Sequence, residues 1–237
     1  MKTVVVNEEI TPLMERGLLK SGFYPIKMPR HHEVDSAVGS HPDGLIFKYE
    51  NELLTPASFC DSAPFVFTDL HDRCPNVKIF FTADEPKSIY PHDAPMNAKI
   101  IGKYLFAKTD TVSSSVIELA KRHSLTVCHT NQGYPACTVL AIDNAALTAD
   151  AGMAKVLQKY GIEVTLIQNG GISLPPHEFG FIGGACGVYD GKVYFFGNID
   201  SHPSADIIKS FCKKHSHEII CLSSEPLVDL GGMIFVD

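Results

Sequence analysis

The sequence predicts an α/β fold made of five copies of one unit, arranged as a ring. A strand, a helix, a second strand, a loop and a third strand follow one another in the same order five times along the 237 residues. The first strand of the chain has no preceding hairpin partner, and the last unit is one strand short. Pairing between the two ends of the chain would therefore complete the ring and leave no exposed sheet edge.

The clearest copy lies between residues 151 and 197. Ala151–Tyr160 has apolar side chains at helical spacing, and Ile162–Ile167 is a short segment rich in β-branched residues, which is typical of a strand. After a loop rich in Gly and Pro, Cys186–Phe196 predicts a hairpin, because Asp190 and Gly191 accept the positive φ angles of a tight turn. The second strand of this hairpin begins the next copy.

The first copy shows the same order with clear helix signals. Thr11 is a suitable N-cap, and Pro12 suits the first position of a helix that continues to Lys20. The other elements of this copy are predicted as strands Thr3–Val6, Tyr24–Met28 and Gly44–Tyr49, with the loop Pro29–Asp43 before the last strand and a turn at Glu50-Asn51.

The remaining copies follow the same pattern. The second is predicted as strand Glu52–Thr55, a helix within Pro64–Cys74, strand Val77–Thr82, loop Ala83–Asn97, strand Lys99–Ile101 and a turn at Gly102. The third is predicted as strand Tyr104–Ala107, helix Thr111–His123 with Asp110 as N-cap, strand Leu125–His129, loop Thr130–Ala136, strand Cys137–Ile142 and a turn at Asp143-Asn144. The fourth starts with strand Ala145–Thr148, and the fifth contains strand Val193–Phe196, a helix ending at Lys214, strand Glu218–Leu222, loop Ser223–Leu230 and strand Met233–Val236. We expect one domain over residues 1–237, with repeats at about 1–51, 52–102, 103–143, 144–191 and 192–237.

This five-copy pattern resembles the pentein fold, a five-fold pseudo-symmetric α/β propeller. The fold is that of the guanidino-group modifying enzymes, namely arginine deiminases, agmatine deiminases, dimethylarginine hydrolases and amidinotransferases. The chain is similar to an uncharacterised bacterial branch with that fold, and the resemblance covers the whole chain through the repeat. An ordinary doubly wound sheet is the alternative, but it would need long loops at regular intervals without a reason.

The composition narrows the class of protein. Hydrophobic residues make up 45% of the chain, which indicates a folded domain, and no apolar run approaches the roughly 18 residues that span a membrane. The seven cysteines are an odd number without paired spacing, so we expect reduced thiols and a cytoplasmic protein. A net charge of -7 disfavours nucleic acid as a partner and suits a small cationic ligand. The sequence indicates no oligomeric state.

In such a ring the loops before the third strand of each copy converge on the central axis, so residues far apart in sequence are expected in one pocket. The chemistry of the family that the chain resembles needs acidic side chains that hold a planar guanidinium cation, a thiolate that attacks its carbon, and a histidine that moves protons. The pKa of the thiol must be lowered by its surroundings or by the bound cation. The candidates of the required types are Cys137, Cys186, His41 and His92 for catalysis, and Asp43, Asp93, Asn97, Glu178 and Asp229 for substrate binding.

The position of the cysteine departs from the family pattern. The resemblance implies a nucleophilic cysteine in the last repeat, shortly after two glycines, but Gly231-Gly232 is followed by Met233 here. The nearest match is the run Gly183-Gly184-Ala185-Cys186, one repeat earlier, and Cys137 lies two repeats earlier. The choice between Cys137 and Cys186 is therefore open, and both also suit a buried structural position at the start of a strand.

Two other interpretations compete with an enzyme of this type. The chain could be a ligand- or protein-binding ring that keeps the fold without the nucleophile, or an α/β hydrolase or transferase of another kind. The absence of a Gly-x-Ser-x-Gly elbow and of a P-loop disfavours the common forms of the latter. We expect no cofactor and no metal, because no glycine pair opens a helix directly after a strand and the spacing of His31, His32 and His41 matches no standard metal site. The leading prediction is a cysteine-dependent hydrolase or amidinotransferase that acts on a small guanidino, amidino or related amide compound.

Overall fold

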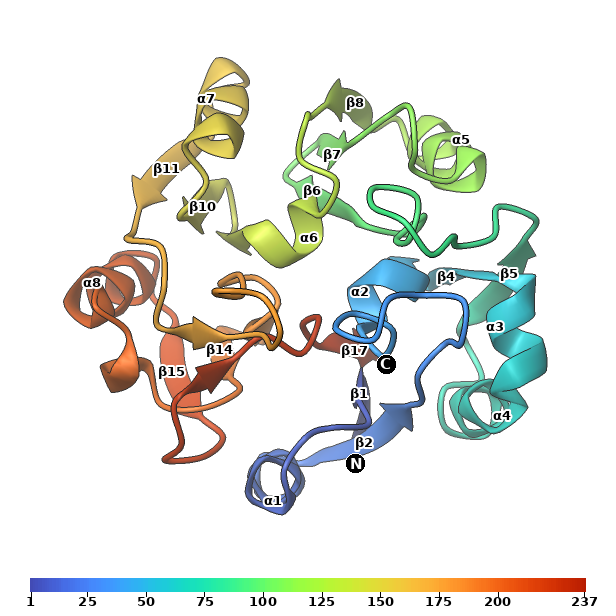
Figure 1. Cartoon of the computed structure of the whole chain (residues 1–237), viewed down its shortest axis with the longest axis horizontal. Coiled ribbons are helices and arrows are strands. Elements are labelled where there is room, and N and C mark those ends of the chain that lie inside the picture. The colour runs from blue at the N-terminus through green and yellow to red at the C-terminus, as the bar shows by residue number, and fades with distance from the viewer.

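The computed structural model describes all residues from Met1 to Asp237 and has a mixed α/β fold. Five three-stranded sheets lie around a common centre, and the longer helices lie on the outside (Figure 1). Each sheet contains one antiparallel and one parallel strand pair. The structure therefore repeats one small unit around a centre, and the centre is where loops of different units meet.

The helices and strands follow the predicted order. The first two units comprise β1 (Lys2–Asn7), α1 (Pro12–Lys20), β2 (Phe23–Met28), α2 (Pro42–Leu45), β3 (Phe47–Tyr49), β4 (Glu52–Pro56), α3 (Ala57–Ser62), α4 (Pro64–Arg73), β5 (Lys78–Thr82) and β6 (Ala98–Ile101). The third comprises β7 (Tyr104–Ala107), α5 (Ser114–Arg122), β8 (Thr126–His129), α6 (Pro135–Thr138) and β9 (Leu140–Ile142). The last two comprise β10 (Ala145–Thr148), α7 (Ala151–Lys159), β11 (Glu163–Leu166), β12 (Ile172–Ser173), β13 (Cys186–Tyr189), β14 (Lys192–Phe195), the 3-10 turn η1 (Ile199–Ser201), α8 (Ala205–Lys214), β15 (Glu218–Cys221), β16 (Leu227–Val228) and β17 (Ile234–Val236).

The sheets join each unit to the next. Their strand orders are β17-β1-β2, β3-β4-β5, β6-β7-β8, β11-β10-β9 and β13-β14-β15, with β12 and β16 paired in a small sixth sheet. The N-terminal strand β1 lies antiparallel to the C-terminal strand β17, with Thr3 opposite Val236 and Val5 opposite Ile234. This is the pairing of the two chain ends that the unpartnered first strand predicts.

The apolar core is distributed around the ring. Buried apolar residues form five clusters, and each cluster joins two neighbouring three-stranded sheets. One of them packs Val4 and Phe23 of the first unit against Tyr194, Phe196 and Leu222 of the fifth. Burial of apolar surface therefore holds neighbouring units together, and the middle of the molecule is free to carry polar side chains.

Local signals place most of the turns and helix ends. The predicted hairpin turns have positive φ angles at Glu50 (50°), Gly102 (56°), Asp143 (51°) and Asp190 (49°), as tight turns require. Thr11 caps α1 as predicted, because its side chain accepts a hydrogen bond of 3.3 Å from the backbone N–H of Met14.

The predicted cap of α5 is wrong. The helix begins after Ser113 and not after Asp110, because the Ser113 side chain accepts a hydrogen bond from the N–H of Ser115. The carboxylate of Asp84, from the preceding loop, accepts hydrogen bonds from the hydroxyls of Ser113 and Ser114 and from the N–H of Ser114. These contacts hold the helix start three residues further along the chain.

Two short helices near the centre replace predicted loop and strand residues (Figure 1). α2 begins at Pro42 within the predicted loop, and α6 begins at Pro135, so that Cys137 lies in a helix and not at the start of a strand. Proline lacks a backbone N–H and has a φ angle suited to the first helical position, which explains where each turn begins. The two turns bring Asp43 and Cys137 to the centre from different units.

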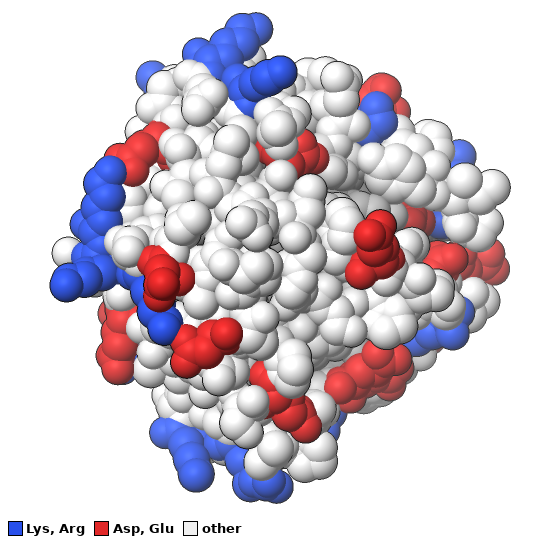
Figure 2. Space-filling model, turned by 60° about the vertical axis from the view of Figure 1, so that its left-hand side comes forward, with Lys and Arg blue, Asp and Glu red and all other residues white.

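The surface carries its charges in a scattered arrangement. On the face shown in Figure 2, basic side chains lie mainly at the edge of the view, and acidic side chains surround a largely uncharged middle. None of the helices is long and apolar enough to cross a membrane.

Candidate active site

A cavity of about 400 Å³ lies between α2, α6 and the loops that precede β6, β13 and β17. Cys137 is the only cysteine that lines it, so we call it the cysteine cavity. Six of the nine predicted site residues line this cavity, and they come from four of the five units: His41, Asp43, Asp93, Asn97, Cys137 and Asp229. The prediction that loops of different repeats would meet in one pocket is therefore confirmed for these residues.

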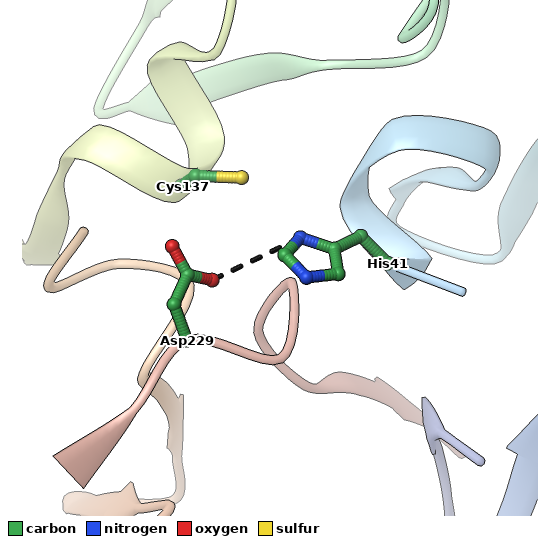
Figure 3. Close-up of side chains that lie close together, drawn as sticks. All are labelled: His41, Cys137 and Asp229. Atoms are coloured by element: carbon green, nitrogen blue, oxygen red, sulfur yellow. Dashed lines mark ion pairs between the residues drawn. The ribbon is translucent and has the colours of Figure 1, made fainter. Parts of the chain in front are cut away.

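Three of these side chains form a tight cluster, shown in Figure 3. His41 precedes α2, Cys137 lies on α6 and Asp229 follows β16, yet their ligand atoms all lie within 4.8 Å of one another. His41 Nδ1 lies 3.8 Å from Asp229 Oδ1, and no more than 5% of any of the three residues is exposed. A thiol, an imidazole and a carboxylate thus meet in a site that is largely closed to water.

Cys137 has two further polar partners. Its thiol donates a hydrogen bond of 2.7 Å to Asp43 Oδ2, and the side-chain amide of Asn97 donates one of 3.5 Å to Cys137 Sγ. Asn97 Oδ1 also accepts a hydrogen bond of 2.8 Å from the N–H of Ala136, within the first turn of α6. Asn97 therefore fixes both the helix turn and the sulfur atom that the turn carries.

Asp229 is held by backbone groups on both sides. Its Oδ2 accepts a hydrogen bond of 2.8 Å from the N–H of Phe181, and its Oδ1 accepts one of 3.1 Å from the N–H of Gly231. Gly231 has a φ angle of +74°, and a Cβ there would lie 2.3 Å from the Cβ of His41. The Gly231-Gly232 pair therefore serves close packing against the histidine.

Burial sets the protonation states of the site. Loss of water raises the pKa of Asp43 from 3.8 to about 8, and burial also raises the pKa of Asp229. Burial lowers the pKa of His41, which favours the neutral imidazole. The pKa of the Cys137 thiol is raised well above its ordinary value by burial and by the nearby charges of Asp43 and Asp229. The protein surroundings of Cys137 thus do not lower the pKa of its thiol. Of the two means that the sequence analysis names, only a bound cation could lower it.

The other predicted site residues lie elsewhere. Cys186 begins β13 and lines a different cavity, and burial raises the pKa of its thiol to about 12. His92 and Glu178 are exposed and do not line the cysteine cavity. Asp93 does line it, and accepts a hydrogen bond of 2.5 Å from the hydroxyl of Tyr134.

Part of the cavity wall consists of residues that the sequence analysis does not predict. This face is mainly aromatic and contains Tyr90, Tyr134, Phe179, Phe181 and also His177. His177 and Phe179 are the two neighbours of Glu178 in the sequence. The sequence therefore predicts the correct loop, but His177 and Phe179 line the cavity and Glu178 does not. In a sequence, aromatic side chains are as typical of an apolar core as of a binding site. Only the structure shows that these ones line a cavity.

The cluster of His41, Cys137 and Asp229 could also hold one metal ion. Its thiolate, imidazole and carboxylate are all ligand types that zinc accepts. His41 Nδ1 is buried and has no hydrogen-bond partner. A chelator control is therefore needed in any assay of this site.

Comparison with known proteins gives the family and the fold. The model of a family of unknown function, DUF6873, matches residues 5–234. The chain belongs to this family. No curated protein matches the sequence.

Solved structures of pentein-fold, guanidino-modifying enzymes resemble this chain over most of its length. Dimethylarginine dimethylaminohydrolase from Pseudomonas aeruginosa, in a mutant form complexed with citrulline, is 8% identical with a TM-score of 0.56, over 94% of this chain and 92% of that one. The C. jejuni agmatine deiminase is 10% identical with a TM-score of 0.56, over 94% and 87%. SxtG, an amidinotransferase from Microseira wollei in the saxitoxin biosynthetic pathway, is 13% identical with a TM-score of 0.54, over 94% and 88%. At these identities the likeness establishes the fold of this family member and not its activity.

Substitution of Gly184 can show how tightly the backbone packs against Asp229. A Cβ at Gly184 would lie 1.9 Å from Asp229 Oδ1, so we expect Gly184→Ala to lower the free energy of unfolding by about 2 kcal/mol, a typical cost of overpacking. Gly152→Ala is the control, because Gly152 lies in α7, where alanine is favoured. Urea unfolding measures both variants, and equal stability of the two would show that Asp229 can move aside.

Proposed function

We propose that this protein is a cysteine-dependent enzyme of the guanidino-modifying type, a hydrolase or an amidinotransferase, with Cys137 as its nucleophile. We propose also that its five units form a closed propeller whose central cavity binds the substrate. The observation that carries the proposal is the cluster in which the sulfur of Cys137, the imidazole of His41 and the carboxylate of Asp229 lie within 4.8 Å of one another. The combination of nucleophile, base and acidic partner is the arrangement that nucleophilic catalysis needs.

The neutral state of His41 suits it to act as a base. In the proposed reaction the Cys137 thiol transfers its proton to His41, and the sulfur forms a bond to the guanidinium carbon. The imidazolium, stabilised by Asp229, then gives the proton to the leaving amine as the carbon–nitrogen bond breaks. Water completes the reaction in a hydrolase, and an acceptor amine does so in an amidinotransferase; either one loses a proton to His41 and displaces the sulfur.

The carboxyl groups suit a cationic substrate. Asp229 is buried beside the sulfur, and Asp43 is partly buried with no hydrogen-bond partner at its Oδ1 atom. Neither carboxyl group forms an ion pair with Lys or Arg, so a planar guanidinium ion could supply both a positive charge and N–H donors. A cation at this position would also stabilise the thiolate, because burial and the nearby carboxyl groups of Asp43 and Asp229 raise the pKa of the thiol. The substrate would in this way activate its own nucleophile.

The wall of the cavity favours a substrate without a carboxylate. The 19 residues that line the cysteine cavity include four aspartates and no Lys or Arg, so an anionic group on the substrate would find no counter-charge. The aromatic side chains of Tyr90, Tyr134, Phe179 and Phe181 offer π faces to a cation and apolar surface to a carbon chain. We therefore propose an alkylguanidine as the substrate class, and not a guanidino amino acid.

A matched substrate series tests this proposal. We expect butylguanidine and 4-aminobutylguanidine to be turned over with kcat/KM at least about tenfold above that of arginine, because only arginine places a carboxylate among the aspartates. Ammonia or amine release, followed by product mass spectrometry, measures turnover with and without a chelator. Preference for arginine would contradict the substrate class alone. Saturable binding without turnover would favour the non-catalytic ring, and turnover lost in chelator would favour a metal-dependent enzyme built on the same three residues.

A further inference from the structure

A second cavity, of about 420 Å³, meets the cysteine cavity at Asp43, which lines both. One strand from each of the five sheets contributes to its wall, namely β3, β6, β9, β13 and β17. Lys48 on β3 and Lys99 on β6 both line it, and we call it the lysine cavity. The proposed reaction uses no residue of this cavity except Asp43.

The two lysines are unpaired cations. Each is only half-buried, but neither ammonium group has an ion-pair or hydrogen-bond partner in the protein. Partial burial lowers the pKa of both, because it removes part of the water that would solvate the charge. No carboxylate therefore neutralises either lysine by direct contact.

The two acids of the cavity balance the charge of the lysines only in part. Asp43 has a pKa of about 8 and is mainly protonated near neutral pH. Asp237 is exposed, and its carboxylate accepts a hydrogen bond of 2.7 Å from the hydroxyl of Tyr189. The charge of Asp237 acts on Lys48, although the two groups form no ion pair. Because two lysines face this one ionised carboxylate, the lysine cavity keeps a net positive charge, in contrast to the acidic wall of the cysteine cavity.

The remaining wall is mostly apolar. Fourteen of its 22 lining residues are hydrophobic, including Phe47, Ile100 and Phe235. Such a wall suits the carbon chain or ring of a ligand and offers few groups to a fully hydrated ion. The fitting ligand thus combines an apolar body with one negative group.

We propose that the lysine cavity is a second binding site, for a small amphipathic anion whose carboxylate or phosphate group lies between Lys48 and Lys99. The charge of Lys99 acts on Asp43, which lines both cavities. An anion that neutralises Lys99 would therefore raise the pKa of Asp43 in the cysteine cavity. The site does not depend on the identity of the reaction, because neither lysine takes part in it.

Calorimetric titration of the purified protein with hexanoate, hexylphosphonate and hexylamine tests the site. We expect one of the two anions to bind saturably at one site per chain, which distinguishes a carboxylate from a phosphate-like group, and hexylamine not to bind there. Lys48→Met and Lys99→Met should each weaken this binding by about tenfold or more, because each removes one charged hydrogen-bond donor. Lys155→Met on the exposed face of α7 is the matched control and should bind as the wild type does.

Lysine labelling provides a readout that does not require a variant to fold. In the wild-type protein, the anion should slow reductive methylation of Lys48 and Lys99, read by peptide mass spectrometry, and leave Lys155 unchanged. The proposal is overturned by heats that do not saturate, by unchanged affinity in both methionine variants, or by equal labelling of Lys48 and Lys99 with and without the anion.

Discussion

Cys137→Ser should lower kcat/KM for the preferred alkylguanidine by at least about 10³-fold, because a serine hydroxyl at this position cannot form the thiolate that attacks the guanidinium carbon. The thermal midpoint should change little, since the replacement is nearly isosteric and a hydroxyl can still donate to Asp43. The measurement is a steady-state assay at saturating and subsaturating substrate, paired with thermal unfolding of the same preparation.

Cys186→Ser is the matched control for this experiment. Like Cys137, Cys186 is buried, but it lies on strand β13 and lines the lysine cavity. It is not part of the cluster of His41, Cys137 and Asp229. We expect it to retain activity within about threefold of the wild type, because it contacts no reacting group. If Cys186→Ser removes activity and Cys137→Ser does not, the nucleophile has been assigned to the wrong cysteine.

Asp43→Asn should stabilise the protein at alkaline pH while it impairs substrate binding. The pKa of Asp43 is 3.8 as an ordinary carboxyl and about 8 in the folded chain. The unfolded chain therefore loses this proton from about pH 4 upward while the folded chain keeps it, so that stability falls as pH rises toward 8. With about 1.4 kcal/mol for each pKa unit, the variant should exceed the wild type by on the order of 5 kcal/mol in free energy of unfolding at pH 8.

The same difference should shrink to less than about 1 kcal/mol at pH 4, where Asp43 is protonated in the folded chain and about half protonated in the unfolded chain. Asparagine keeps an oxygen that can accept the hydrogen bond from Cys137, so the geometry of the site is preserved. Urea unfolding of wild type, Asp43→Asn and the exposed control Asp72→Asn between pH 4 and pH 9 measures the effect. A constant difference between Asp43→Asn and the wild type across this range would mean that Asp43 ionises normally in the folded protein.

The local sequence is sufficient to predict the repeated unit. The tight turns at Asp143 and Asp190, the proline and threonine at the start of α1, and the short β-branched strands are each decided by neighbouring residues. Because every unit contains the same local signals, their order along the chain revealed the architecture without long-range information. The unpartnered first strand then indicated its pairing with the last, which the register of β1 and β17 bears out.

Local sequence was insufficient for the two central helices. The local pattern predicts loop and strand for the runs His41-Pro42-Asp43 and Tyr134-Pro135-Ala136-Cys137, although both contain a proline that suits the first position of a helix, as Pro12 does in α1. A helix of four residues has too few apolar positions to show a period. Its existence depends on contacts such as the hydrogen bond from the N–H of Ala136 to Asn97, which come from another unit.

Residue chemistry and repeat position were enough to name the types of side chain at the centre, and His41, Asp43, Cys137 and Asp229 are among the nine candidates they produced. They could not separate Cys137 from Cys186 or His41 from His92, because equivalent positions of a repeat look alike in sequence. The separation depends on the direction in which each side chain points and on the water that surrounds it. Both follow from packing between units: the same burial that brings Cys137 beside His41 also raises the pKa of its thiol and that of Asp43.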